Sequence, residues 1–405
     1  MIKSVRLTNF FSFRDETIHF EPGSNVLIGI NGSGKSNFLK ALTLLKTGVE
    51  GNGDDNALQS FIVSRYGGFD NIYCQSLGDH KFENTIGLEF TLNGQMLSEY
   101  GPINFREDVL YKIVLIRKAD TSNYYISEKI TTKGGYKYLD FINGEGVVNE
   151  RKEGSNTGFI RYDDYNAQEL SLSKISEFDK DRYLPLVTIK RALRSIYIYN
   201  YFDTTYRSKL RQSMMATSST QQLLADGTNL PQILNQIKIS DKVSYQRLTE
   251  SLTDVNPYFR GFDFHFLGSG VFELMLDERQ LKSSVHITHV SDGTLRYLCL
   301  LAILFNVKPG SVICIDEPEV GLHPDMILNV SKAIKEAATK ATLIIVTHST
   351  DILNYFELEE VRVFEKDEVN TTVVSSFNQS DFEGWYEEYL PGKMWKAGDL
   401  GGQRW

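Results

Sequence analysis

The sequence predicts an α/β fold with a parallel sheet whose two halves are separated by the middle of the 405-residue chain. Three observations predict it. A glycine-rich run at residues 29–36 lies between a strand pattern and a helix pattern. Short alternating segments with Gly or Asn turns fill residues 84–160, which is typical of antiparallel strands. Helix and strand patterns then alternate between residues 293 and 347, which is typical of a parallel sheet covered by helices.

The first 45 residues predict three strands, a loop and a helix. Ile2, Val5 and Leu7 belong to an irregular first strand. The further elements expected from apolar spacing are strands 17–20 and 25–30 and a helix over 37–47. A polar loop is expected at 48–56, where Gly, Asp and Asn cluster.

The rest of the chain divides by pattern. Residues 165–255 are rich in Leu, Ser, Gln and Lys at helical spacing and predict a helical insertion with a break at 226–227. The elements expected after it are strands within 262–288, helix 293–306, strand 311–315, helix 325–338 and strand 342–347. We therefore expect one α/β head domain with its N-terminal half at 1–160, a helical lid at 161–260 and its C-terminal half at 261–405.

Composition limits the classes of function. The net charge is −9, so any contact with nucleic acid must come from a local basic patch. No run of about 18 apolar residues exists, and the N-terminus lacks the apolar region of a signal peptide. The three cysteines have no metal-type spacing and are expected to be buried, reduced thiols in a cytoplasmic protein without a membrane segment.

The glycine-rich run fits the pattern G-x-x-x-x-G-K-[ST] at Gly29, Gly34, Lys35 and Ser36. Such glycines let successive backbone N–H groups point into one concavity, and the following helix adds its N-terminal dipole. Lys35 is expected to reach the β- and γ-phosphates of ATP, and the Ser36 hydroxyl to bind Mg²⁺. The full set of nucleotide-binding residues expected here is Asn31, Gly32, Ser33, Gly34, Lys35, Ser36 and Asn37.

Two carboxylates follow the apolar strand pattern near residue 312. Asp316 ends that strand, at the edge of a parallel sheet where ligands bind, and is expected to hold Mg²⁺. Glu317 would then lie toward an attacking water, as phosphoanhydride hydrolysis requires. The next strand ends near His348, which is expected on an adjacent strand edge within reach of a γ-phosphate.

A second anion site is predicted at Ser291 and Gly293, which precede a strongly apolar helix. Because the chain already has one complete phosphate loop, this second site needs a second nucleotide or a second chain.

These motifs, in this order, resemble ABC-type ATPases of the SMC/RecF/OLD branch. The opening "SVRLTNFFSFRDETIHFEPGSNVLIGINGSGKSNFLKAL", the distant "SDGT", "IDEPE", "GLHP" and a strand ending in "TH" carry the resemblance. "LLADGTNLPQILNQI" and "LPGKMWKAGDLGGQRW" also look like stand-alone bacterial AAA-type ATPases of this branch, many of which are believed to act in anti-phage defence beside a separate effector.

The resemblance implies roles by position. Lys35 and Ser36 are Walker A, Asp316 is the Walker B metal ligand, and Glu317 is the catalytic base. It further implies a signature that caps the γ-phosphate bound by a partner subunit, formed by Ser291, Gly293 and Thr294, a D-loop at 321–324, and a switch histidine at His348. A Mg²⁺-sensing glutamine is also usual in the family, and Gln75 is the candidate for it.

Departures from the family pattern narrow the type of ATPase that we expect. "SDGT" differs from the longer form of transporter subunits, and residues 165–255 are too short for an SMC coiled coil. No acidic cluster of a TOPRIM nuclease follows residue 355, so an OLD-like ATPase without that nuclease domain is expected.

Two further stretches have alternative readings. Residues 188–213 interleave basic and aromatic residues, which suits nucleic acid or a solvated helical face; the basic residues are Lys190, Arg191, Arg194, Arg207, Lys209 and Arg211. The tail carries Trp395 and Trp405, as a binding surface or as a segment folded onto its own domain.

The leading hypothesis is a Mg²⁺-dependent, dimerising ATPase switch, forming a homodimer or higher homo-oligomer, that controls a separately encoded effector or nuclease. The alternatives are a RecF-like DNA-binding ATPase in DNA repair and a low-turnover nucleotide-binding scaffold. A small-molecule kinase is disfavoured, because kinases have no use for the signature or the adjacent glutamate.

Overall fold

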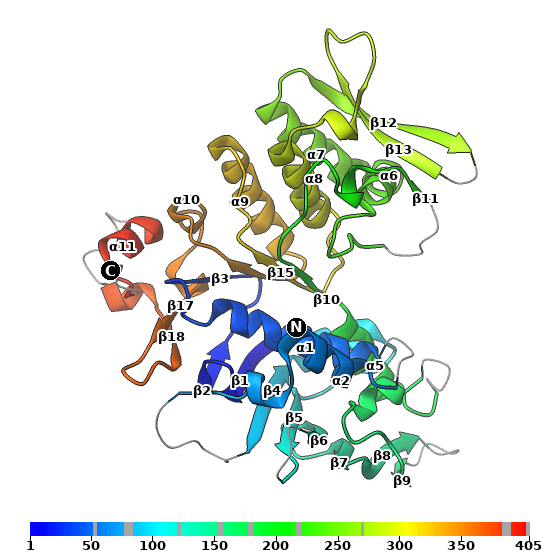
Figure 1. Ribbon diagram of the computed structural model, residues 1–405, viewed down its shortest axis with the longest axis vertical. Coiled ribbons are helices and arrows are strands. Elements are labelled where there is room, and N and C mark those ends of the chain that lie inside the picture. The colour runs from blue at the N-terminus through cyan, green and yellow to red at the C-terminus, as the bar shows by residue number, and fades with distance from the viewer. Residues whose placement is uncertain are drawn as a thin grey trace.

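The computed structural model describes residues 1–51, 55–76, 84–119, 123–151, 157–176, 181–215, 221–268, 271–382 and 390–401. These residues form a central mixed sheet, a long antiparallel sheet and a small third sheet, with helices between and around them (Figure 1). The predicted α/β fold is confirmed.

The central sheet is built from both halves of the chain. Its order is β10-β15-β16-β3-β17-β18, and every neighbouring pair is parallel except β17–β18. The strands are β3 (Ser24–Gly29), β10 (Ile196–Tyr199), β15 (Val312–Asp316), β16 (Thr342–Val346), β17 (Val361–Lys366) and β18 (Thr372–Ser376). Because β3 lies beside β16 and β17, the N-terminal phosphate loop is placed among C-terminal strands.

Apolar side chains alternate between the two faces of this sheet, as strand geometry requires. On β15, Cys314 packs into one core with helices α1 (Lys35–Glu50) and α5 (Leu184–Arg194). The neighbouring Ile313 packs into the other core, with α8 (Asp292–Phe305) and α9 (Pro324–Ala338). The helix after the phosphate loop and the helix after Ser291 therefore lie on opposite faces (Figure 1).

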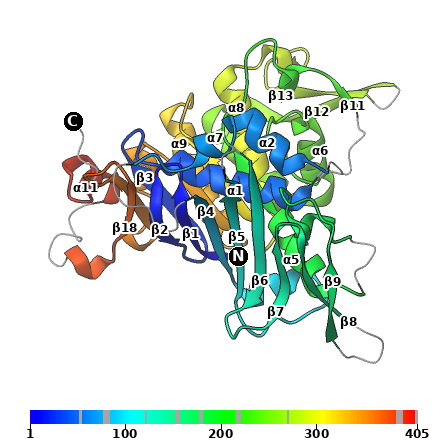
Figure 2. The same ribbon diagram turned by 60° about the horizontal axis from the view of Figure 1, so that its bottom comes forward.

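The antiparallel sheet has the order β2-β1-β4-β5-β6-β7-β8-β9 and lies on the α1 side (Figure 2). Its strands are β1 (Ile2–Phe10), β2 (Phe13–His19), β4 (Thr85–Leu92), β5 (Val109–Arg117), β6 (Tyr124–Thr132), β7 (Lys137–Ile142), β8 (Glu145–Arg151) and β9 (Thr157–Tyr162). Helix α1 is buried between the two sheets, so its buried side chains cover most of its circumference.

The remaining elements extend both cores. The third sheet contains β11 (Met214–Met215), β12 (Phe259–Gly268), β13 (Val271–Glu278) and β14 (Val285–His286). The other helices are α2 (Ala57–Tyr66), α3 (Phe69–Ile72), α4 (Gly94–Leu97), α6 (Leu230–Ser240), α7 (Lys242–Val255), α10 (Thr350–Leu353) and α11 (Pro391–Ala397). Short 3₁₀ turns are η1 (Ser98–Tyr100), η2 (Ser171–Lys174), η4 (Lys209–Arg211), η5 (Ile287–His289), η6 (Leu358–Glu360) and η7 (Gln379–Phe382).

Two element predictions need correction. Helix α1 is longer than 37–47: it begins at Lys35 and runs into the expected polar loop, ending where Gly51 adopts a left-handed φ of 60°. The segment 165–255 is not wholly helical, because Ile196–Tyr199 forms the edge strand β10 of the central sheet. Its sequence, "IYIY", consists of β-branched and aromatic residues that favour strands. The domain boundaries at 160 and 260 remain a prediction.

The cysteine expectation is confirmed in part: Cys74, Cys299 and Cys314 are buried and free. Burial raises the pKa of both Cys299 and Cys314, so these thiols stay protonated. None of the helices within the described ranges is long and apolar enough to cross a membrane.

Candidate nucleotide-binding site

Three adjacent strands carry the predicted site residues to one edge of the central sheet. Strand β16 lies between β15 and β3, and all three run parallel. The glycine-rich loop follows β3, Asp316 ends β15, and His348 lies two residues beyond β16. The carboxyl ends of these strands therefore bring together the phosphate loop, the two carboxylates and the histidine.

The phosphate loop depends on glycine at two positions. Gly29 has φ of 146°, and a Cβ there would lie 2.2 Å from the carbonyl oxygen of Phe364. Gly34 has φ of 116°, and a Cβ there would lie 2.3 Å from Thr372 Oγ1. Both conformations and both close approaches exclude a side chain, so the loop geometry is fixed by these residues.

Polar contacts from β18 and from the turn before β2 hold the loop in place. Thr372 Oγ1 lies 2.7 Å from the Ser33 carbonyl oxygen and 2.7 Å from Ser12 Oγ. Asn37 donates its amide to Ser12 Oγ over 2.9 Å. Ser33 and Asn37 therefore contribute to the support of the loop, whereas Asn31, Gly32 and Ser36 are exposed at its surface.

Lys35 is a buried cation inside the loop. Its ammonium donates to the carbonyl oxygens of Gly29 (2.8 Å) and Ile30 (2.9 Å). Burial lowers the pKa of Lys35 to about 8, against the opposing effect of Asp316 and Glu317. The Lys35 ammonium therefore interacts electrostatically with both carboxylates.

Asp316 is a carboxylate whose charge is disfavoured. Burial and the neighbouring Glu317 raise the pKa of Asp316 to about 6, while Lys35 acts in the opposite direction. A divalent cation at this position would favour the ionised form.

Glu317 has a strained backbone. Its φ is 48°, which is rare for a residue with a side chain, and its N–H donates to the Val346 carbonyl oxygen over 2.8 Å. Its Oε1 lies 3.8 Å from His348 Nε2. With this strained backbone, the Glu317 carboxylate lies beside the histidine.

A third acid, Glu319, was not predicted as a site residue. Its Oε1 accepts hydrogen bonds from the Thr347 hydroxyl and from the backbone N–H of His348, both over 2.8 Å. Its Oε2 is buried and has no hydrogen-bond partner among the described residues. Burial raises the pKa of Glu319. The second glutamate of "DEPE" was the available signal, but only the fold shows that it joins β15 to the histidine.

The donor set fits Mg²⁺ held jointly with a nucleotide. Among the described residues, no group of three or more His, Cys, Asp or Glu side chains is arranged to hold a metal ion alone. Mg²⁺ is usually bound by one or two protein oxygens together with substrate phosphates. Ser36, exposed at the start of α1, and Asp316 are the residues that would hold it.

The predicted signature forms a capped helix start on the other face of the sheet. Ser291 Oγ accepts the N–H of Thr294 over 3.2 Å and so caps α8. A Cβ on Gly293 would lie 2.8 Å from the Gly321 carbonyl oxygen. Arg296 donates to the Val320 carbonyl oxygen over 2.6 Å. The signature turn and the predicted D-loop are therefore packed directly against each other.

A family model described as "AAA domain, putative AbiEii toxin, Type IV TA system" matches residues 24–354. The chain belongs to this family. The match spans the phosphate loop, the carboxylates and the histidine. The chain is thus an ATPase-family member of the ABC/SMC/RecF type, as its sequence similarities and its fold also indicate.

Individual curated proteins match shorter parts of the chain than the family model does. The chain is 24% identical over 276 residues to "Structural maintenance of chromosomes protein 3" of Caenorhabditis elegans, covering 58% of this chain and 21% of the relative. It is 27% identical over 100 residues to "DNA replication and repair protein RecF" of Carboxydothermus hydrogenoformans, covering 25% and 27% of the two chains. The chain thus spans about a quarter or less of these two relatives.

Two solved structures share the fold. One is an SMC head bound to the C-winged helix domain of ScpA, with TM-score 0.57, 13% identity, and 94% and 99% of the two chains covered. The other is the Pyrococcus furiosus Smc head with an extended coiled coil, bound to the C-terminal domain of ScpA, with TM-score 0.55, 13% identity, and 96% and 98% covered.

Other residues singled out in the sequence lie outside the nucleotide site. Gln75 donates its amide to the Asp70 carbonyl oxygen over 2.9 Å, and its role as a Mg²⁺ sensor stays a prediction. Trp395 is buried on α11, with its ring 6.5 Å from the ring of His348, so this part of the tail folds onto its own domain. Trp405 lies outside the described residues.

The basic stretch 188–213 does not form one surface. Lys190 is buried and donates to the carbonyl oxygens of Ser173 and Ile175. Arg211 is buried as well, whereas Arg207 and Lys209 are exposed. The remaining members, Arg191 and Arg194, line a groove described next.

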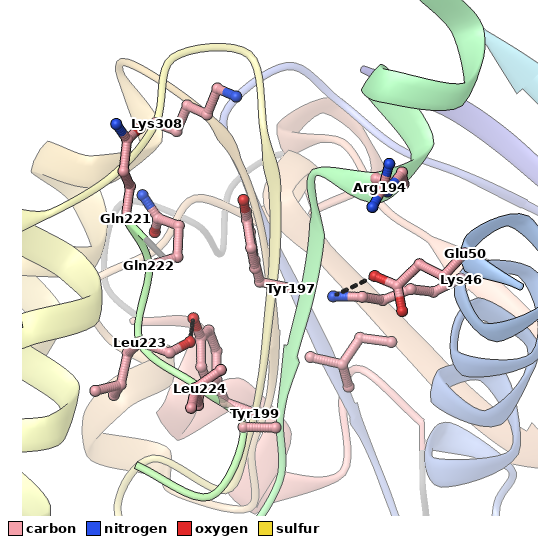
Figure 3. Close-up of a pocket in the computed structure, with 12 residues that line it drawn as sticks. Lys46, Glu50, Arg194, Tyr197, Tyr199, Gln221, Gln222, Leu223, Leu224 and Lys308 are labelled. Atoms are coloured by element: carbon pink, nitrogen blue, oxygen red, sulfur yellow. Dashed lines mark hydrogen bonds and ion pairs between the residues drawn. The ribbon is translucent and has the colours of Figure 1, made fainter. Parts of the chain in front are cut away.

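This groove, the basic groove, is lined by residues of β10 and by Lys46 and Glu50 of α1 (Figure 3). These two residues are at the C-terminal end of α1, whereas the phosphate loop precedes its N-terminal end. It consists of a hollow of about 390 Å³ and an adjoining one of about 430 Å³, which share Arg194, Tyr197 and Lys308. Lys46 adds a cation whose Nζ lies 2.7 Å from the Ile196 carbonyl oxygen and 3.8 Å from Glu50 Oε1. The basic groove is distinct from the nucleotide site, because Lys46 is about 16 Å along the helix from Lys35.

Proposed function

We propose that this chain is a Mg²⁺-dependent, ATP-hydrolysing switch that dimerises around nucleotide and regulates a separately encoded effector or nuclease in anti-phage defence. The observation that carries the catalytic part is the convergence of Lys35, Asp316 and the Glu317–His348 pair at one edge of the sheet. The family description, which names a TA system, supports a role beside a second gene product.

The proposed roles follow from the chemistry of these residues. Lys35 and the loop N–H groups bind the phosphates, and Ser36 and Asp316 hold Mg²⁺. Mg²⁺, when bound, neutralises charge on the phosphates. Glu317 orients and deprotonates the attacking water, and His348 contacts the γ-phosphate side of the site. Glu319 keeps His348 in place through its backbone N–H.

Dimerisation is supported by the two faces of the sheet. The phosphate-loop helix α1 and the signature helix α8 pack into different cores, so Lys35 and Ser291 approach one nucleotide most simply from two copies of the chain. The two solved SMC heads, each bound to part of ScpA, are examples of this fold with a protein partner.

The test is ATP hydrolysis with matched variants. Wild-type protein should hydrolyse ATP only with Mg²⁺. Glu317→Gln should slow hydrolysis by about 100-fold or more, because it removes the base, yet keep ATP affinity. Lys35→Ala should lose ATP binding itself. Normal turnover in purified Lys35→Ala protein would refute the assignment. ATP binding without measurable turnover in the wild type would favour the low-turnover scaffold instead.

A second candidate function, DNA binding in repair by a RecF-like protein, is favoured by the basic groove. The groove gathers cations from three parts of an acidic chain: Lys46 on α1, Arg191 and Arg194 on α5, and Lys308 before β15. Tyr197 adds an aromatic ring, over which Lys46 Nζ lies 5.0 Å from the centroid. Cations with an aromatic platform suit single-stranded nucleic acid.

Two double variants test this candidate. Arg194→Glu with Lys308→Glu should weaken binding of a single-stranded DNA oligonucleotide by about tenfold or more at low salt, and should reduce the salt dependence. Arg207→Glu with Lys209→Glu, which changes exposed residues of the same stretch outside the groove, is the matched control and should bind normally. Absence of wild-type binding at low salt, or equal effects of both variants, would exclude the groove as a DNA site.

A further inference from the structure

One buried arginine contacts nearly every residue that leads into the predicted signature. Arg211 lies in η4, within the segment predicted to be a helical insertion, and its side chain is only about 5% exposed. Its Nη1 lies 2.9 Å from the carbonyl oxygen of Ile287, 3.2 Å from that of Thr288 and 2.7 Å from that of Val290.

The other guanidinium nitrogens complete this arrangement. Nε donates to the Thr204 carbonyl oxygen over 2.8 Å, within the segment that carries Arg211 itself. Nη2 forms an ion pair with Asp292, the first residue of α8. The planar guanidinium therefore joins the chain before Ser291, the residue after it, and the segment between β10 and β11.

The opposite side of the same turn is also held by an arginine. Arg296, one turn into α8, donates to the carbonyl oxygen of Val320, the residue before the predicted D-loop. Ser291, Asp292 and Gly293 thus lie between two arginine contacts. Ser291 and Asp292 are themselves exposed, so the turn presents its polar groups to the outside while its backbone path is fixed from within.

These contacts exclude a role for Arg211 in nucleic-acid binding. Its donors face backbone carbonyl oxygens and Asp292, and removing a buried guanidinium leaves several of these acceptors unsatisfied. Within the described ranges the exposed Arg207 of the same stretch has no comparable network: its Nε donates to the Tyr206 hydroxyl over 2.5 Å.

We propose that Arg211 is a positioning residue for the signature: it fixes the backbone at 287–292 so that Ser291 and Gly293 meet a nucleotide bound by the phosphate loop of a second copy of this chain. The inference rests on the proposed function, because it needs a nucleotide shared between two copies. It gives the middle segment of the chain a role in the composite site, that is, the ATP site formed by the phosphate loop of one copy and the signature of the other. It also makes the signature sensitive to movements of that segment.

The test uses ATP-dependent dimerisation in a background that cannot hydrolyse. Glu317→Gln protein should form dimers in ATP and Mg²⁺, whereas Glu317→Gln with Arg211→Ala should stay monomeric at the same concentration. ATP affinity of Arg211→Ala, measured with a fluorescent ATP analogue, should remain within about twofold of the wild type, since the phosphate loop is intact. Arg207→Ala is the matched control and should behave as the wild type in both assays.

A mixing experiment then assigns Arg211 to one half of the composite site. Arg211→Ala mixed with Lys35→Ala should regain ATPase activity, because one shared site keeps an intact loop and an intact signature. Arg211→Ala mixed with Ser291→Arg should stay inactive, because both chains lack a working signature. Arg211→Lys, which keeps the charge but not the planar fork, covers the case in which Arg211→Ala fails to fold and should show the same pattern.

Each outcome separates this inference from the proposed function. If Glu317→Gln alone stays monomeric in saturating ATP, the shared site itself is wrong. If Glu317→Gln dimerises and the double variant dimerises equally well, Arg211 does not position the signature. Loss of ATP affinity in both Arg211→Ala and Arg211→Lys would show a general structural role instead and would also overturn the inference.

Discussion

At the scale of single residues, the candidate site contains neighbouring acids that disfavour one another's ionisation. Asp316, Glu317 and Glu319 are three acids within four positions, and burial together with their mutual repulsion raises the pKa of Asp316 and of Glu319. Lys35 offsets part of this charge, although burial lowers its own pKa. A bound cation would stabilise the ionised carboxylates, so the occupancy of this site by Mg²⁺ should depend on pH.

The first prediction concerns pH and Mg²⁺. The pKa of Asp316 is about 6 in the folded chain, so below that pH Mg²⁺ must displace a proton. The Mg²⁺ concentration needed for half-maximal ATP-analogue binding should rise as the pH falls, approaching about tenfold per pH unit well below 6. Fluorescence titrations with Mg²⁺ between pH 5.5 and 7.5 measure it.

The control removes one cause of the raised pKa. In Glu317→Gln the like charge beside Asp316 is gone, so the pKa of Asp316 falls and the rise in Mg²⁺ requirement should begin at a lower pH. Because phosphate groups also titrate near pH 6, the difference between the two proteins is the diagnostic quantity. Superimposable pH curves for both proteins would contradict this account of Asp316.

The second prediction concerns Glu319. Glu319→Ala should lower kcat by about tenfold or more with little change in KM, because the Thr347 hydroxyl and the His348 N–H lose their acceptor and the histidine moves. Glu319→Gln keeps an acceptor oxygen at the same place and should retain most activity. Steady-state kinetics on both variants decide it. Equal loss in the two would mean that the negative charge, and not the hydrogen bonds, matters.

At the scale of elements, most of the site-bearing structure could be predicted from the sequence. The strands and helices around Lys35, Asp316 and His348 have strong patterns, and the structure confirms each of these elements to within a few residues. The edge strand β10 was missed because four residues, "IYIY", are too short for a periodicity to be recognised inside a segment rich in helix formers. The position of Glu319 and the burial of Arg211 were missed for another reason: both depend on contacts between segments distant in sequence.

The third prediction tests the contact between the signature helix and the D-loop. Gly293→Ala should push these elements apart, because the new Cβ would lie 2.8 Å from the Gly321 carbonyl oxygen, a backbone atom that cannot rotate away. ATP binding should persist, whereas ATP hydrolysis should fall by about tenfold or more. Gly261→Ala on β12 is the matched control, since among the described residues its Cβ would meet only the Tyr245 hydroxyl at 3.5 Å. Wild-type hydrolysis by Gly293→Ala would show that this packing is dispensable.

At the scale of the whole molecule, the fold separates the two halves of the predicted ATP site. Val26 on β3 packs with the core that contains α8, whereas Leu27, its neighbour, packs with the core that contains α1. Neighbouring side chains of β3 thus pack into two different cores, one with the phosphate-loop helix and one with the signature helix, on opposite faces of one sheet. The sequence shows both motifs but not their separation, because the face on which each helix packs is set by the topology of the connections.

The last prediction follows from this separation. A chain that binds ATP but cannot hydrolyse it should accumulate as a dimer, with each nucleotide between Lys35 of one copy and Ser291 of the other. Glu317→Gln protein should therefore change from monomer to dimer on addition of ATP and Mg²⁺, as measured by light scattering after size-exclusion chromatography. Glu317→Gln with Lys35→Ala is the control: it should remain monomeric, because it lacks the nucleotide that joins the copies. Glu317→Gln with Ser291→Arg should also remain monomeric although it binds ATP, because the arginine occupies the space needed by the partner's phosphates. A strictly monomeric Glu317→Gln protein in saturating ATP would exclude the shared site, and dimers that form equally without ATP would show that the copies associate through another surface.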